Sequence, residues 1–140
     1  MITGAVLAFL LVTVLVLRRV AQRGTADLGE LVQGRRPERS ETVLGLGVES
    51  RGAAQVRGNG SLALLEDELL FVQWVPRRVT RIPRASITAV ETPRAFLGKT
   101  MGSRLLAVSW RTPEGGQDRI AWKVRDLDAW LAALSHGREP

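Results

Sequence analysis

The tripeptide GKT at residues 98–100 is the clearest hint of chemistry in this chain, because it matches the end of a phosphate-binding P-loop. A P-loop has the spacing G-x-x-x-x-G-K-[ST], and it opens a helix whose N-terminal N–H groups face the phosphates. The glycine that this spacing requires five residues before Gly98 is replaced by Pro93. Residues 101–110 alternate with a period of two, which is typical of a strand and not of a helix. We therefore interpret GKT as part of a glycine-bearing turn in which Lys99 is a solvated charge.

The sequence contains few residues of the types that other catalytic sites require. The chain has no cysteine, and its one histidine, His136, lies close to the C-terminus, so thiolate zinc sites, Cys nucleophiles and Ser-His pairs are not expected. Glu66, Asp67 and Glu68 fall together in one predicted turn, so they do not indicate two carboxylates on either side of a cleft. The sequence predicts a protein that is not an enzyme, with no catalytic residue, metal site or cofactor.

The basic residues are the second feature that could bind a ligand. The formal net charge is +6, and between residues 77 and 111 eight basic residues, which we call the basic belt, accompany a single acid, Glu91. Such a belt can meet anionic lipid headgroups or an acidic protein, or it can be a solvated face of an arginine-rich chain. Nucleic acid is not expected, because the tryptophans fall at core positions and leave no aromatic ring for base stacking. We predict that seven members of the belt contact lipid or a partner: Arg77, Arg78, Arg81, Arg84, Arg94, Lys99 and Arg104.

An uncharged apolar run from Ile2 to Leu17 precedes Arg18, Arg19 and Arg23. Sixteen residues extend about 24 Å as a helix, somewhat less than the ~30 Å hydrocarbon core of a bilayer. A signal peptide would carry its positive charge before the run, and a buried core helix would need a larger domain to cover it. We therefore expect a transmembrane anchor and an integral contact with the membrane. The positive-inside rule then predicts a single-pass protein of the cell membrane, with its N-terminus outside and its C-terminal domain in the cytoplasm.

The remaining chain divides into a linker and one domain. We predict an anchor at residues 1–20, a polar juxtamembrane linker at 21–42 and a β domain at 43–136. Within the domain, a period of two in 69–75 and 104–111 predicts half-buried antiparallel strands. The turn at 66–68 is expected to join 61–65 to the first of them in a hairpin, and the turn at 113–117 to join the second to the strand that follows it. Further strands are expected at 119–125 and, as short pieces, at 52–58, 78–82 and 86–92.

The last part of the domain changes to a helical period. Leu127, Trp130, Leu131 and Leu134 share one face of a predicted amphipathic helix. Asp126 suits the N-cap of this helix, and Gly137 suits its end. A helix this short is not stable alone, so we expect it to pack on the sheet.

Two stretches of the domain resemble the bacterial PH/GRAM-like fold. The segment GNGSLALLEDELLFVQW at 58–74 is similar to its hairpin G-x-G-x-L-x-L-T-x-x-x-L-x-F, with Leu65 where Thr is usual. The segment RIPRASITAVE at 81–91 is similar to its I-P-L-x-x-I-x-x-V stretch, with Arg84 in place of an apolar residue. The resemblance covers about residues 43–135, and it implies a mainly β protein whose bent antiparallel sheet or barrel is closed by the C-terminal helix.

These expectations together define a function. A protein with this fold and no catalytic motif is expected to be a membrane-tethered cytoplasmic binding or scaffolding module that contacts anionic lipid headgroups. The alternative is an adaptor that docks a protein partner of a membrane or cell-envelope complex, through an exposed sheet edge for example.

Overall fold

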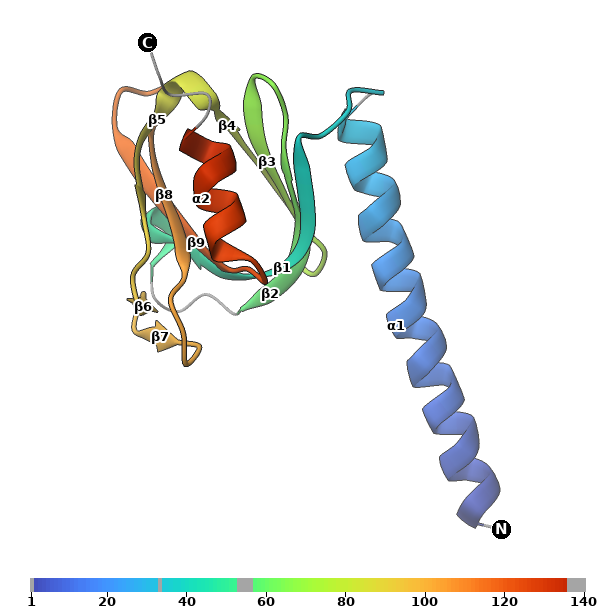
Figure 1. Cartoon of the computed structure of the whole chain (residues 1–140). Coiled ribbons are helices and arrows are strands. Elements are labelled where there is room, and N and C mark those ends of the chain that lie inside the picture. Colours follow the sequence, from blue (N-terminus) through green and yellow to red (C-terminus); the bar gives the residue numbers. More distant parts are fainter. Residues whose placement is uncertain (1, 33, 53–56, 136–140) are drawn as a thin grey trace.

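The computed structural model describes residues 2–32, 34–52 and 57–135, and Figure 1 shows a long helix that projects from a β domain wrapped around a second, short helix. The elements in chain order are α1 (Ile2–Val32), β1 (Arg39–Val48), η1 (Glu49–Arg51), β2 (Gly58–Leu64), β3 (Glu68–Gln73), β4 (Arg78–Pro83), η2 (Arg84–Ser86), β5 (Ile87–Glu91), β6 (Ala95–Phe96), β7 (Lys99–Thr100), β8 (Leu106–Arg111), β9 (Gln117–Lys123) and α2 (Leu127–Ser135).

Seven strands form one antiparallel sheet in the order β4-β3-β2-β1-β9-β8-β5. The two predicted hairpins are present as β2–β3 and β8–β9. Strand β1 joins the two halves of the sheet, because its pairing passes from β2 to β9 with a register shift between Gly45 and Gly47. A bulge of this kind bends a strand, and the sheet accordingly curves around α2 (Figure 1). The short strands predicted at 78–82 and 86–92 are confirmed as β4 and β5, the two edges of the sheet.

The main core fills the inside of the bent sheet. Trp110, Trp122 and Trp130 belong to this core and are at most 7% exposed. The predicted C-terminal helix is confirmed as α2, and Asp126 caps it by accepting a hydrogen bond of 3.1 Å from the Ala129 N–H. The predicted end of the helix at Gly137 lies outside the described residues, as does most of the strand predicted at 52–58. A bent sheet leaves an opening, and α2 fills it with its apolar face.

Strand β3 is buried on both faces, and so is most of β8, so the prediction that these strands are half-buried is wrong. Leu69 and Phe71 belong to the main core, whereas Leu70 and Val72 belong to a second cluster on the outer face of the sheet. Val32, from the last turn of α1, is part of this outer cluster. Helix α1 therefore covers the outer face of β3, which the alternating pattern had led us to expect in contact with solvent.

The GKT segment lies in the small hairpin β6–β7. Leu97 and Gly98 form its turn, with φ angles of 50° and 74°, and Lys99 pairs with Phe96. The predicted glycine-bearing turn is confirmed, and the strand β7 follows it in place of the helix that a P-loop requires. Phe96 packs on the outer face of β8 and β9, so this hairpin covers a third apolar cluster.

Helix α1 differs from the transmembrane anchor that the sequence predicted. In the part of the chain that the structure describes, no helix is both long and apolar enough to cross a bilayer. The predicted transmembrane anchor at 1–20 is therefore wrong, and so are the integral membrane contact, the single-pass localisation and the topology inferred from it. The physical reason is length, since the uncharged run ends at Leu17 after about 24 Å of helix and α1 continues with arginines.

Two glycines, one in β1 and one in the hairpin motif, make room for an aromatic ring. A Cβ atom at Gly60 would lie 2.5 Å from Cε1 of Phe71 and 2.5 Å from the carbonyl oxygen of Val72, and one at Gly45 would lie 2.9 Å from Cζ of Phe71. The ring of Phe71 also meets Trp122 edge to face, with centroids 5.6 Å apart. The two glycines therefore let this aromatic pair lie close to the sheet.

We expect Gly60→Ala to lower the free energy of unfolding by about 1–3 kcal/mol, because neither the ring nor the backbone oxygen can move away freely. The matched control is Gly116→Ala in an exposed turn, where the nearest atom to the new Cβ is 3.5 Å away and the expected change is within about 0.5 kcal/mol. Urea denaturation of the full chain measures both. Equal midpoints for the two variants would contradict the close packing of Phe71.

We expect Trp130→Ala to lower the free energy of unfolding by about 3–5 kcal/mol, because this fully buried side chain fills the opening of the sheet. Asp128→Ala on the exposed side of α2 serves as the control, with an expected loss of at most about 1 kcal/mol. Thermal and urea denaturation followed by circular dichroism would report the difference. If the two variants unfolded together, α2 would not be packed in the core.

Candidate functional site

The structure distributes the predicted basic belt over separate parts of the fold. Arg77 and Arg78 are exposed at the turn from β3 to β4, on one edge of the sheet. Arg94 is exposed just before the β6–β7 hairpin, and Lys99 lies within that hairpin. Arg104 is also exposed and donates a 3.4 Å hydrogen bond to Oγ1 of Thr92. Contact of these residues with a ligand remains a prediction.

Arg84 is an internal connector. Its side chain is only 10% exposed and forms an ion pair of 3.0 Å with Glu38. The same guanidinium donates hydrogen bonds to the carbonyl oxygens of Leu65, at 3.1 Å, and of Ala133 in α2, at 3.3 Å. Arginine supplies several donors in a fixed geometry, so this side chain ties the β2–β3 turn to the last turn of α2. Arg84 stands where the PH/GRAM-like pattern has an apolar residue, and these contacts give it a structural role in this chain.

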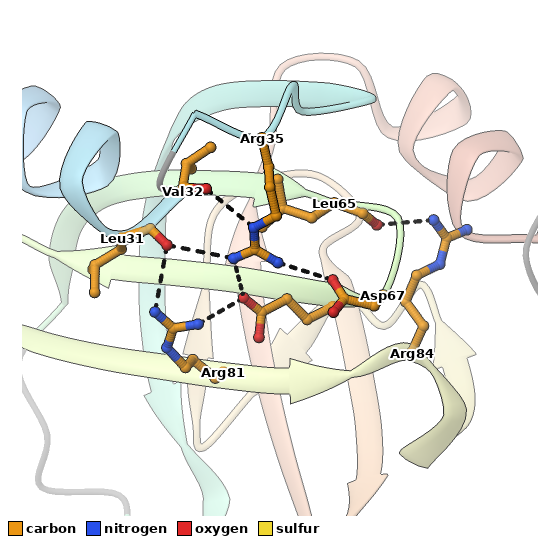
Figure 2. Close-up of polar contacts among 8 residues, drawn as sticks. Leu31, Val32, Arg35, Leu65, Asp67, Arg81 and Arg84 are labelled. Atoms are coloured by element: carbon orange, nitrogen blue, oxygen red, sulfur yellow. Dashed lines mark hydrogen bonds and ion pairs between the residues drawn. The ribbon is translucent and has the colours of Figure 1, made fainter.

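Arg81 belongs to a polar cluster that holds the end of α1, shown in Figure 2. Arg81 and Arg35 share one carboxylate oxygen of Glu68, at 2.7 and 2.9 Å, and Arg35 also pairs with Asp67 at 3.0 Å. Both guanidiniums donate to the carbonyl oxygen of Leu31 in the last turn of α1. We call Arg35, Asp67, Glu68 and Arg81 the α1 clamp.

The clamp supplies hydrogen-bond donors and positive charge to the carbonyl groups at the end of α1. The last carbonyl groups of a helix lack intrahelical partners and carry the negative end of the helix dipole, so cations stabilise them. Gly34 has a φ of 76°, and after this turn the N–H and Nε of Arg35 both donate to the carbonyl oxygen of Val32, at 3.1 and 3.0 Å. Next to the clamp in the chain, Val32 belongs to the outer cluster with Leu65, Leu70 and Val72. Polar and apolar contacts together fix α1 on the domain.

The other half of α1 has the opposite character. The large apolar side chains between Val6 and Leu17 are 46–72% exposed, and in the described residues the only other exposed large apolar side chain is Val75. We call residues 4–17 the apolar arm, and Figure 1 shows it projecting away from the β domain. A monomer seldom exposes an apolar patch of more than a few hundred Å², so the arm is the strongest candidate for an interaction site. The sequence revealed this run but led us to place it in a bilayer.

A polar groove of about 460 Å³ lies between η1 and the strands β8 and β9, and the sequence did not predict it. In this groove Ser50 donates a 2.6 Å hydrogen bond from Oγ and a 3.1 Å hydrogen bond from its N–H to Asp118. No local signal could have found the pair, because 68 positions separate its members. The carboxylate already accepts these bonds, and no group of three or more His, Cys, Asp or Glu in the described residues could hold a metal ion. We assign no chemistry to this groove.

Comparison with known proteins supports the fold and names no family. No protein-family model matches the chain, and no curated protein matches its sequence. Among solved structures, it resembles the crystal structure of the C-terminal domain of an unknown protein from Leishmania infantum, with a TM-score of 0.53 and 15% sequence identity. The match covers 88% of this chain and 99% of the other. At this identity the likeness shows a common antiparallel β-sheet with helices and carries no function.

The α1 clamp predicts a fixed angle between α1 and the domain, and this angle can be measured. Since the chain has no cysteine, spin labels can be placed at Leu17→Cys and Ala132→Cys, both exposed, without other changes. We expect a single narrow distance distribution. Glu68→Gln should broaden it, because the substitution removes the charge that two arginines share and weakens the clamp by about 1–2 kcal/mol.

The control for this measurement is Glu66→Gln, which removes an exposed carboxylate two positions away, outside the clamp. The control should leave the distance distribution unchanged. Identical distributions in the wild type, Glu68→Gln and Glu66→Gln would show that Glu68 does not hold α1 in place.

Proposed function

We propose that this chain is a non-catalytic adaptor of the PH/GRAM-like class, and that it docks a protein partner through the apolar arm of α1. The assignment to this class is supported by the seven-strand order and by α2, which fills the opening of the bent sheet. It is also supported by the hairpin motif, whose glycines at 58 and 60 lie beside Gln73 and Phe71.

One observation carries the docking role, namely the contrast between the two ends of α1. The C-terminal turn is buried and clamped, with Val32 only 7% exposed, whereas Phe9 in the arm is 72% exposed. A helix left unpacked along its whole length would not have one end held by both apolar contacts and ion pairs. The clamp therefore acts as the base of a rigid arm, which presents apolar side chains to a partner.

The basic belt gives weaker support to the alternative ligand, an anionic lipid headgroup. Two of the four arginines in its densest cluster, Arg81 and Arg84, already serve the fold through ion pairs with Glu68 and Glu38. Their guanidiniums face these carboxylates and backbone carbonyl groups of the same chain. The adaptor role is thus the better supported of the two.

Site-specific photo-crosslinking in intact cells tests this function. We expect a photoreactive amino acid at Leu11, which is 62% exposed in the arm, to give discrete adducts with protein. The same amino acid at Glu114, an exposed residue of the β8–β9 turn, is the control and should give none of these adducts. Adducts with lipid alone at position 11, or the same protein adducts from both positions, would refute the docking role of the arm.

A further inference from the structure

We propose that the edge of β4 is a second docking surface, which binds an extended acidic segment of a partner protein as an added strand. This surface is separate from the apolar arm, so the inference goes beyond the docking function proposed above. It rests on the backbone groups that β4 leaves unpaired, on the regularity of this edge and on the charge along it.

The register of β4 shows which of its backbone groups point away from the sheet. Antiparallel pairs alternate between those that exchange hydrogen bonds and those that do not. The N–H of Arg84 donates to the carbonyl oxygen of Asp67 at 2.9 Å, so every second residue of β4, counted back from Arg84, bonds to β3. Pro83 fits this alternation, because proline has no N–H to leave unpaired at an outward position. The N–H and carbonyl groups of Val79 and Arg81 therefore face outward, where a partner strand can pair with them.

Of the two edges of the sheet, β4 is the more regular template for a strand. All six of its residues pair with β3 without a register shift. The other edge, β5, has a register shift between Ile87 and Ala89, and irregularities of this kind hinder the addition of a strand. Arg78 and Arg81 are exposed, and Figure 2 shows the side chain of Arg81 turned toward α1 on the outer face of the sheet. The backbone edge of β4 is thus accessible beside the α1 clamp.

The charge along β4 selects an acidic partner. Residues 77–84 contain four arginines and no acid. Two of them, Arg81 and Arg84, already have carboxylate partners, whereas the exposed Arg78 has none among the residues that the structure describes. Opposite charges on directly paired residues of neighbouring strands are stabilising, and like charges are destabilising. Pairing with β4 of a second copy would bring arginines together without an acid in either strand, so a second copy is not the occupant.

The register also predicts where the partner segment carries its acid. In an antiparallel strand bonded to Val79 and Arg81, three consecutive residues lie opposite Thr80, Val79 and Arg78, in that order. The side chain of Val79 packs against the outer cluster, so we expect an apolar residue opposite it. The next residue of the partner lies opposite Arg78 and is the expected acid. A β-branched residue opposite Thr80 completes the predicted sequence of β-branched, apolar and acidic residues.

A displayed library of random peptides of about eight residues tests this surface, with the full chain as the bait. Counter-selection against the Val79→Pro variant removes peptides that bind the apolar arm, because the arm is unchanged in this variant. The substitution removes the outward N–H of β4 and no hydrogen bond of the β3–β4 ladder. Val90→Pro is the matched control, since Val90 is also a half-buried valine with an outward N–H, in the edge strand β5.

We expect the enriched peptides to share the apolar–acidic pair and to bind Val79→Pro at least about tenfold more weakly than the wild type, and Val90→Pro within about twofold. Arg78→Glu should weaken binding of the same peptides, and replacing their acid with lysine should restore it. No enrichment over the counter-selection, or loss of binding in Val90→Pro and not in Val79→Pro, would refute the β4 edge.

Enriched peptides without an acid, or equal binding by the wild type and Arg78→Glu, would refute the acidic partner. Circular dichroism shows whether each variant is folded. If Val79→Pro were unfolded, Arg78→Glu would replace it in the counter-selection, and the exchange of charges between Arg78 and the peptide would decide. The apolar arm is intact in every variant, so none of these outcomes depends on the docking function of α1.

Discussion

The structure depends on the interior that a strongly bent sheet creates. The register shift between Gly45 and Gly47 turns β1 from one half of the sheet to the other, and the space inside the bend is too wide for the strands alone to fill. Helix α2 fills it, with Trp130 fully buried in the main core. Phe71 and Trp122 meet at the bend, where glycines allow the backbone and the ring to approach closely. The bend and the helix are therefore complementary, because each leaves apolar surface that the other covers.

Burial of the outer faces of the sheet distinguishes this chain from a simple sandwich of sheet and helix. The end of α1 covers one outer cluster, and the β6–β7 hairpin covers another. Polar groups secure the first of these contacts, because a helix end needs donors for its carbonyl groups. Arginines that composition alone would assign to a ligand surface supply those donors. Part of the chain's arginine content is thus a consequence of how the fold is held together.

A clamped helix with an exposed apolar arm has a mechanical consequence. Any contact made by residues 4–17 is transmitted through one continuous helix to the outer face of β3 and β4, because α1 runs without a break to Val32. The adaptor that we propose would therefore fix the orientation of its β domain as well as its position. A flexible linker of the same length would fix the position alone.

The sequence by itself determined the local elements. The period of two in β8 and β9, the helical stripe of α2 with its N-cap at Asp126, and the turn at GKT are all local patterns, and the structure contains them. The tertiary structure alone decided which faces are buried and which charges are paired. Leu69 and Leu70 are equally apolar and lie on opposite faces of β3; the bend of the sheet around α2 makes Leu69 an inner residue, and α1 buries Leu70 on the outer face. Glu68 and Arg35 are 33 positions apart, and Arg84 reaches Ala133 across 49, so no spacing rule predicts these contacts. Side chains distant in sequence meet only after the sheet has bent, and that is why the role of the basic residues could not be inferred from their density.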